Sequence, residues 1–268
     1  MLRFAMLLLS LVFAGAAHAQ GKLEVLWLGQ ATFKITTPGG KVIVIDPWLK
    51  TNPKTPAQYK DLKALGKVDV VLVTHAHFDH VADAAELVKM NNVKLYAPPG
   101  LSGTLVSVGE LTGEQAPGMN KSGIVTPLGP EIKFHMVRAE HSSEYRHTDP
   151  ATKKVTMMPG GEPVGWIVEL ENGFKIYHMG DTGLFGDMRF IGEFYKPDLV
   201  LVPIGGNFTI NAQLGAYAIR EMIKPKYAIP MHYGTFPVLA GKPEDFVKGL
   251  EGAPTQVIVI EPGAKVTF

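Results

Sequence analysis

The sequence predicts an α/β domain in which two β-sheets pack face to face and helices cover their outer faces. Runs of β-branched and other apolar residues recur along the chain, and helical stretches follow several of them. Residues 67–73 and 196–202 also resemble each other, since each segment begins Lys-x-Asp and continues as an apolar run. Each of these segments leads into a loop and then a helix. The chain therefore reads as two similar halves, with one sheet in each.

The first half is expected to form a meander of three strands, followed by a buried strand over residues 68–73. Turn residues at Pro38-Gly39-Gly40 separate the second and third runs. A short helix is expected over residues 82–90. The expected strands cover residues 23–28, 31–36, 41–45, 68–73 and 93–96.

The pattern restarts after a stretch rich in glycine and proline over residues 109–129. One helix is expected from the Asn211 cap to about Ile223, ended by Lys224-Pro225, and another around residues 244–250. The expected strands cover residues 131–137, 164–170, 174–178, 198–202, 227–231 and 256–260.

The amino-terminal residues predict a secretory signal peptide over residues 1–19. Arg3 gives a positive start, residues 4–14 are apolar, and Ala17-His18-Ala19 has the small-x-small pattern of a cleavage site. The apolar run is too short to span roughly 30 Å of hydrocarbon, so no stable membrane insertion is expected after cleavage. These features predict a periplasmic or secreted protein with one domain over residues 20–268.

The composition excludes several classes of protein. The chain has no cysteine, which excludes disulfides, thiolate metal ligands and a thiol nucleophile. Its formal net charge of +1 argues against a nucleic-acid partner. A small-molecule substrate is therefore expected. Self-association into an oligomer is left open.

Four candidate metal ligands fall within residues 74–80, directly after the apolar run 68–73. These are His75, His77, Asp79 and His80. Imidazole and carboxylate groups suit zinc and similar divalent cations. A loop that leaves the end of a strand can direct such side chains toward one point.

Three further candidate ligands follow apolar runs in the second half of the chain. His141 comes after the strand expected to end at residue 137, Asp181 after the strand 174–178, and His232 after the strand 227–231. Structural zinc sites usually fill four positions with protein ligands. Six or seven ligands shared between two ions leave positions open for water, which favours a catalytic site over a structural one.

These motifs carry a family resemblance. His-x-His-x-Asp-His, followed by a later His, Gly-Asp-Thr and His, resembles the metallo-β-lactamase superfamily and implies its αββα sandwich. Trp27-Leu28-Gly29, Ile45-Asp46-Pro47 and the segment 229–233 are similar to uncharacterised metal-dependent hydrolases related to L-ascorbate-6-phosphate lactonase. The resemblance implies that one ion binds to three histidines, a second to three other residues, and that Asp181 bridges them. The first set is His75, His77 and His141, and the second is Asp79, His80 and His232.

The expected chemistry is hydrolysis by a hydroxide that bridges two divalent ions, expected to be zinc, with manganese or iron as alternatives. Asp79 and Asp181 are the predicted catalytic carboxylates, and Asp79 is expected to orient the hydroxide. Three residues are predicted to support the ligands or the leaving group, namely Asp46, Gln30 and Tyr233. For Asp46, a simple turn with Pro47 is an equal alternative. Gln30 stands where related hydrolases usually have histidine, so a titrating role is not expected there.

The sequence predicts the class of bond that is cleaved but not the identity of the substrate. An ester, lactone or phosphoester of a small molecule is expected, with Asn120 and Arg146 as candidate substrate contacts from loops. Two alternatives remain: an exported β-lactamase, and a protein that binds metal or ligand without turnover. The bridging position of Asp181 argues against the exported β-lactamases that also lack cysteine.

Overall fold

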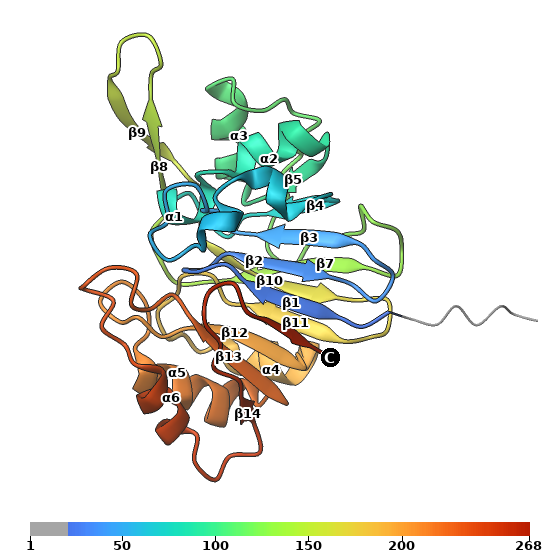
Figure 1. Ribbon diagram of the computed structural model, residues 1–268, viewed down its shortest axis with the longest axis vertical. Coiled ribbons are helices and arrows are strands. Elements are labelled where there is room, and N and C mark those ends of the chain that lie inside the picture. Colours follow the sequence, from blue (N-terminus) through green and yellow to red (C-terminus); the bar gives the residue numbers. More distant parts are fainter. Residues whose placement is uncertain (1–20) are drawn as a thin grey trace, which may run out of the picture.

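The computed structural model describes residues 21–268, which form two β-sheets packed face to face with helices on both outer sides (Figure 1). The predicted α/β sandwich is therefore confirmed. The expected signal peptide over residues 1–19 lies outside the described residues. Within the described part of the chain, no helix is both long and apolar enough to cross a bilayer.

The first sheet has six strands in the order β15-β1-β2-β3-β4-β5. The first three strands of the chain form an antiparallel meander, to which β4 and β5 add in parallel. The strand β15 pairs antiparallel with β1 and brings the end of the chain back to the edge of this sheet. The bounds are β1 Glu24–Trp27, β2 Phe33–Thr36, β3 Val42–Ile45, β4 Val70–Leu72, β5 Lys94–Tyr96 and β15 Lys265–Thr267.

The second sheet has seven strands in the order β14-β13-β12-β11-β10-β7-β6. The four strands from β11 to β14 are parallel, and the rest are antiparallel. Two further strands, β8 Glu144–Thr148 and β9 Val155–Pro159, pair only with each other and project from the body as a hairpin (Figure 1). The sheet's own bounds are β6 Ile124–Val125, β7 Lys133–Arg138, β10 Val164–Glu169, β11 Lys175–His178, β12 Leu199–Pro203, β13 Tyr227–Met231 and β14 Gln256–Val257.

Helices cover the outer face of each sheet. The first sheet carries η1 Ala57–Tyr59, η2 Leu62–Leu65, α1 Phe78–Val81, α2 Ala84–Asn91 and α3 Pro99–Ser107. The second carries α4 Met188–Tyr195, α5 Ala212–Tyr217, the π-helical turn η3 Ala218–Ile223, and α6 Pro243–Gly249. The expected helix from Asn211 to Ile223 is thus present, with a change of winding at residue 218. The side chain of Asn211 caps it by accepting a hydrogen bond from the Leu214 N–H.

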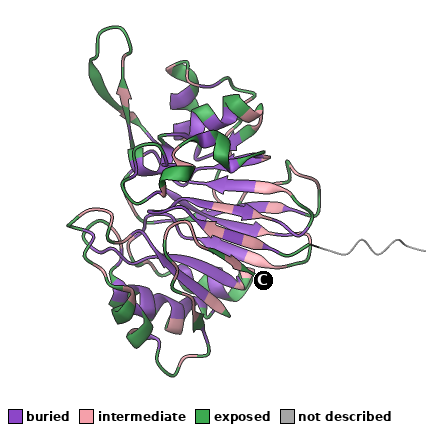
Figure 2. Ribbon diagram, viewed as in Figure 1, coloured by how far each residue is buried: buried purple, intermediate pink, exposed green. Residues whose placement is uncertain are grey.

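Three apolar clusters hold the layers together. The central cluster lies between the sheets and includes the fully buried Phe33, Phe134 and Trp166. The other two clusters join each sheet to its own helices. Figure 2 shows that the strands are buried along most of their length, as expected where both faces of a sheet are covered.

The two halves repeat one detail that the sequence similarity anticipates. Asp69 precedes β4 and accepts a hydrogen bond from the Val42 N–H at 2.8 Å, while Asp198 precedes β12 and accepts one from the Lys175 N–H at 2.9 Å. Each carboxylate therefore ties the start of a parallel strand to the strand beside it. The sequence similarity between residues 67–73 and 196–202 therefore corresponds to the same hydrogen-bonding role of an aspartate in each sheet.

Several elements were not expected from the sequence. The helix α3 begins at Pro99-Gly100, where proline is well tolerated because the N–H that it lacks would have no partner in the first turn. The helix α4 contains Gly192, where a Cβ atom would lie 2.6 Å from the Cα of Ile223. Glycine is therefore required there for close packing against η3.

The strand ends that matter for function point toward one edge of the sandwich. In the first sheet β1, β3 and β4 run in one direction, and in the second sheet β7, β11 and β13 share a direction. All of the candidate ligands lie in the segments that directly follow strands of these two sets, Asp79 and His80 on the short helix α1 and the others in loops. The topology therefore gathers residues from widely separated parts of the chain.

Candidate metal centre

The loop between β4 and α1 carries His75 and His77, leads directly into Asp79 and His80 on α1, and is held by the opposite sheet. The Val164 N–H donates to the carbonyl oxygen of Thr74 at 3.0 Å, and the indole N–H of Trp166 donates to that of Val73 at 3.2 Å. Both donors lie on β10. The ligand loop therefore has a fixed position between the two sheets, which preorganises its side chains.

The first group of ligands consists of His75, His77 and His141. One nitrogen of each imidazole lies within 4.8 Å of the other two. His75 Nε2 and His77 Nδ1 are 3.0 Å apart, and the ring of His141 lies edge-on to both at centroid distances of 5.1 Å. The three rings thus face a common point.

The second group consists of Asp79, His80, Asp181 and His232, all of which are buried. His232 Nε2 lies 3.4 Å from Asp79 Oδ2 and 3.1 Å from Asp181 Oδ1. His80 Nε2 lies 3.3 Å from the same Asp181 oxygen. Bonds of about 2.0–2.1 Å in a tetrahedral arrangement would place ligand atoms roughly 3.4 Å apart. The spacing in this group matches that of a zinc-like ion.

Asp181 faces both groups. Its Oδ1 atom belongs to the second group, while Oδ2 lies 3.6 Å from the Nε2 of His141 in the first. The preceding Gly180 has a φ of +62°, and a Cβ atom there would lie 2.8 Å from the Cβ of Thr74. Only glycine permits the close approach that brings Asp181 to this position.

The electrostatics of the second group favour a positive charge at its centre. Burial opposes ionisation of Asp181, but His232 and His80 hold the pKa of its carboxyl well below the usual range. Burial also opposes protonation of His232, yet Asp181 and Asp79 raise the pKa of its imidazole to about 9. The carboxylates are therefore balanced by protons that a bound cation would displace.

Unpartnered atoms give an independent test of fit to a metal. His80 Nε2 and Asp181 Oδ1 are buried, and neither has a hydrogen bond of acceptable geometry. Buried polar atoms without partners are costly and rare, and these two belong to the same ligand group. Both are good donors to a divalent ion, so the residues fit a metal centre.

Asp46 lies directly behind the second group. Its Oδ1 accepts from the Thr74 N–H at 2.7 Å, and its Oδ2 lies 2.7 Å from both Thr74 Oγ1 and His80 Nδ1. A carboxylate that binds Nδ1–H leaves the Nε2 lone pair free to bind an ion. Asp46 thus fixes the tautomer and the orientation of His80.

Gln30 lies against the ligands. Its Nε2 is 2.7 Å from Asp79 Oδ2 and 2.7 Å from His232 Nε2, while its Oε1 is buried without a partner. The backbone at Gln30 has a φ of +51°, and its carbonyl oxygen accepts from the His232 N–H at 3.0 Å. A strained and fully buried residue therefore directs its amide at the second group.

The comparisons with known proteins agree with this geometry. The profile of the Beta-lactamase superfamily domain matches residues 41–233, which include every candidate ligand. A UPF0173 metal-dependent hydrolase of Polaromonas sp. is 58% identical over 255 residues, covering 95% of this chain and 93% of the relative. The chain belongs to the metal-dependent hydrolases of the beta-lactamase superfamily.

A second relative and a solved structure are similar to this chain over almost its whole length. A UPF0173 metal-dependent hydrolase of Cupriavidus necator is 60% identical over 250 residues, covering 92% of this chain and 86% of the relative. Among solved structures, Igni18, a metallo hydrolase from the archaeon Ignicoccus hospitalis, has a TM-score of 0.77 and 33% identity, covering 92% of this chain and 98% of that chain. The predicted superfamily and its sandwich fold are confirmed.

The same comparisons correct the prediction of export. The relatives are described as UPF0173 metal-dependent hydrolases, a family that is not known as exported. The signal peptide expected over residues 1–19 and the periplasmic character inferred from it therefore lack support. The small-x-small pattern at residues 17–19 is short, and an apolar start with one arginine recurs in many chains, which explains how the pattern misled.

Three residues predicted to assist the site of this hydrolase lie elsewhere. Tyr233 packs its ring on Trp27 at a centroid distance of 5.5 Å, and it is absent from the wall of the cavity beside the ligands. Asn120 is exposed and lines a different hollow beside α3. Arg146 is exposed on β8 of the projecting hairpin (Figure 1). The structure therefore does not bring these three side chains to the cavity beside the ligands.

His77 of the first group has a neighbour, Glu144, that was not expected from the sequence. Glu144 Oε2 lies 3.3 Å from His77 Nε2, and Ser142 Oγ lies 3.4 Å from the same nitrogen. These contacts orient the ring of His77 so that Nδ1 faces His75. The position of Glu144 three residues after His141 was its only signal in the sequence.

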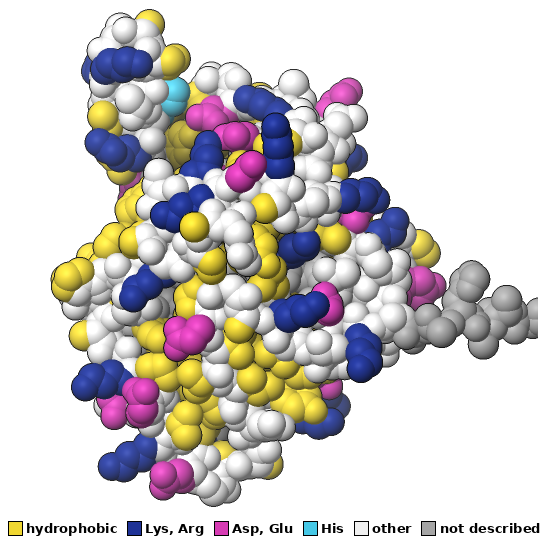
Figure 3. Space-filling view, in the orientation of Figure 1, with side chains coloured by type: hydrophobic (Ala, Val, Ile, Leu, Met, Phe, Trp, Pro, Cys, Tyr) yellow, Lys and Arg dark blue, Asp and Glu magenta, His cyan; other side chains and the backbone are white. Residues whose placement is uncertain are grey.

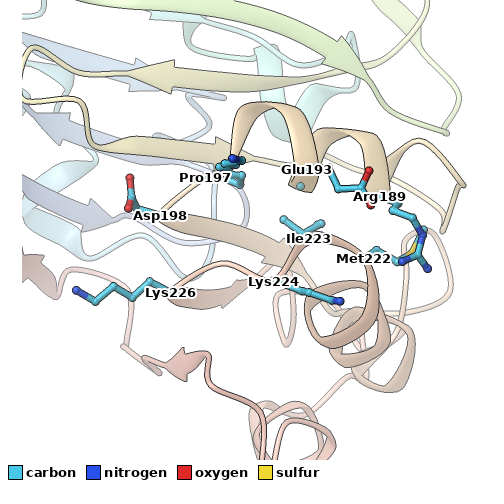
Figure 4. Close-up of a pocket in the computed structure, with 10 residues that line it drawn as sticks. Arg189, Glu193, Pro197, Asp198, Met222, Ile223, Lys224 and Lys226 are labelled. Carbon is cyan, nitrogen blue, oxygen red and sulfur yellow. The ribbon is translucent and has the colours of Figure 1, made fainter.

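A cavity of about 330 Å³ opens beside the ligands of both groups, including His77, His141, Asp181 and His232. A larger hollow of about 380 Å³ lies between α4 and the end of η3 (Figure 4). Its labelled side chains, among them Arg189, Glu193 and Lys224, are spread along the surface rather than directed at one point. The hollow contains none of the candidate ligands, so the smaller cavity is the candidate substrate site.

Proposed function

We propose that this protein is a dinuclear hydrolase that cleaves an ester, lactone or phosphoester bond in a small molecule. The observation that carries the proposal is the position of Asp181, whose two carboxylate oxygens face different groups of ligands. A single ion cannot use both groups fully. Two ions bridged by Asp181 would use every ligand in them.

Each group would hold one ion. His75, His77 and His141 would bind the first through imidazole nitrogens, and the second would bind to the other histidines and carboxylates. Zinc suits this mixture of nitrogen and oxygen ligands, and manganese or iron would also be accepted. When bound, such ions supply an acidified water as the nucleophile and polarise the bond that it attacks.

The protein residues have distinct tasks in this scheme. Asp79 is held by Gln30 at 2.7 Å and lines the cavity, so its carboxylate is placed to accept a proton and to orient the attacking water. Asp46 keeps His80 in the tautomer that binds an ion.

A substrate panel tests the proposal. The purified protein is stripped with a chelator, reloaded with zinc or manganese, and assayed on lactones, carboxylic esters, thioesters, phosphodiesters and β-lactams. We expect metal-dependent turnover of at least one ester, lactone or phosphoester, abolished by the chelator. Turnover of β-lactams alone would identify a β-lactamase, and stoichiometric metal without any turnover would identify a metal-binding protein.

A further inference from the structure

The cavity beside the metal ligands has an apolar wall. It is formed by four side chains from the short helix α1 and from the loops after β12 and β13, namely Phe78, Phe208, Phe236 and Leu239. Phe78 is 54% exposed and Phe208 is 61% exposed, although large apolar side chains are usually buried. Figure 3 shows apolar side chains at the edge of the molecule where the loops after β12 and β13 project in Figure 1.

Part of this wall is rigid. The ring of Trp48 meets Phe78 edge-on at 5.4 Å and stacks on Phe236 at 5.8 Å. The indole N–H of Trp48 donates to Thr51 Oγ1 at 2.7 Å, which fixes the central ring of the three. Phe78 also lies between the ligands His77 and Asp79 in the sequence. The aromatic surface is therefore positioned together with the metal centre.

The charges around the cavity do not suit an anionic substrate group. Among the residues that line it within 21–268, none is a lysine or arginine. The carboxylate of Glu144 lies 3.3 Å from the Nε2 of His77, so the charge added beside this cavity-lining ligand is negative. Arg146, the candidate partner for an anion, is exposed on the hairpin instead. An anionic tail would lose its hydration without gaining a partner.

We propose that the cavity binds uncharged carboxylic esters, lactones included, whose acyl part is an apolar chain or ring seated against Phe78, Phe208 and Phe236. This inference rests on the proposed hydrolase function. In the reaction, the oxygen of water bonds to the acyl carbon, the bond from that carbon to the ester oxygen breaks, and a proton passes to the leaving oxygen. A volume of about 330 Å³ is at the small end for ligand pockets, which limits the substrate to a small molecule.

A series of p-nitrophenyl esters tests the proposal with the metal-loaded protein. Each added methylene should raise kcat/KM roughly fourfold from the acetate to the butyrate, as expected for burial of about 0.8 kcal/mol per methylene. The hemisuccinate, which places a carboxylate at the end of a similar chain, should react at least about tenfold more slowly than the butyrate. Equal rates along the series, or a faster hemisuccinate, would overturn the proposal.

Two phenylalanine variants distinguish the loss of a side chain from the cavity wall from the loss of any exposed phenylalanine. Phe208→Ala should flatten the dependence on chain length, because it removes an exposed part of the wall. Phe190→Ala should leave the dependence unchanged, since Phe190 is similarly exposed, at 56%, but lies on α4 outside the cavity. The same slope in both variants would count against the assigned wall.

Binding measurements keep this inference separate from the proposed chemistry. If no carboxylic ester, lactone or phosphoester is hydrolysed, the proposed function fails, but the cavity can still be tested with the amides acetanilide and butyranilide and the anionic succinanilic acid by calorimetry. Butyranilide should bind more tightly than either of the other two, and Phe208→Ala should weaken it. Preference for the anion, or no binding of any of them, would overturn the assigned ligand class.

Discussion

The Oδ2 atom of Asp46 lies 2.7 Å from the Nδ1 of His80, and both side chains are fully buried. The other carboxylate oxygen of Asp46 accepts from the Thr74 N–H at the start of the ligand loop. One residue therefore sets both the tautomer of a ligand and the position of the loop that carries it. Pairs of this kind usually strengthen metal binding tenfold to a hundredfold.

Asp46→Asn should weaken metal binding by about tenfold or more, because an amide cannot offer a negative oxygen to both His80 and Thr74. Asn tolerates the left-handed backbone at this position, where φ is +49°, so the backbone itself is little affected. Competition with a coloured chelator measures the affinity. Asp69→Asn is the control, since Asp69 precedes β4 at the end opposite the ligands. Equal affinities in the two variants would refute the role given to Asp46.

Gln30→Met should selectively weaken the second ion. Methionine has a similar length and faces the same backbone strain, but it cannot hold the Asp79 carboxylate as the Gln30 amide does at 2.7 Å. At limiting zinc, we expect the bound metal to fall from two ions toward one per chain, with kcat reduced by about tenfold or more. Elemental analysis and equilibrium dialysis check this result. Two tightly held ions in the variant would show that the amide does not support this group.

Gly180→Ala should lose metal as well as stability. Its Cβ would meet Thr74 at 2.8 Å, and the resulting shift would displace Asp181. Gly173→Ala provides a matched control, because Gly173 also has a positive φ, +82°, but an open space around its Cβ position. Both variants should lose on the order of 1 kcal/mol of stability from the left-handed backbone. Only the change at residue 180 should lower the metal content, as measured by elemental analysis.

His178 should make the stability of the protein fall in mild acid. Burial lowers the pKa of its imidazole, whose Nε2–H donates to the Ala31 carbonyl oxygen while Nδ1 accepts from the Gly180 N–H. The folded protein therefore keeps the ring neutral, whereas the unfolded chain protonates it. The stability contributed by the neutral His178 side chain is fully present above a pH of about 6.5. It is lost as the pH falls below that value, by at most about 1.4 kcal/mol per pH unit.

Urea unfolding between about pH 7.5 and pH 5.5 checks the contribution of His178. His178→Gln should be less stable at the higher pH but should lose less stability on acidification than the wild type. His147→Gln, on the projecting hairpin, should keep the wild-type slope. A parallel loss in the wild type and in His178→Gln would mean that the acid sensitivity comes from other groups.

The grouping of the candidate ligands could be predicted from the sequence because the first polar residues of each ligand segment come shortly after an apolar strand. His75, His141 and His232 all follow this rule, and strands that run in one direction carry their ends to the same edge. The sandwich was accessible for a similar reason, since the runs around Asp69 and Asp198 repeat in both halves. Local patterns predict these features because backbone direction, rather than side-chain packing, determines them.

The surroundings of the ligands could not be predicted in the same way. Tyr233 follows a ligand directly, but the backbone of His232 has a φ of +57° and the chain turns so that the Tyr233 ring packs on Trp27. Phe78 and Phe236 of the apolar wall are far apart in the chain, and both pack against Trp48 behind them. Contacts of this kind depend on tertiary packing between distant residues, which the periodicity of the sequence does not predict.

Metal stoichiometry in the wild type and in Asp181→Ala tests the dinuclear centre most directly. Asp181 has one oxygen in the second group and the other 3.6 Å from His141 in the first. After loading with zinc and removal of the excess, the wild type should hold two ions per chain. Asp181→Ala should lose most of the bound metal and nearly all turnover. Two ions and full activity in Asp181→Ala would contradict the bridging carboxylate and the centre built on it.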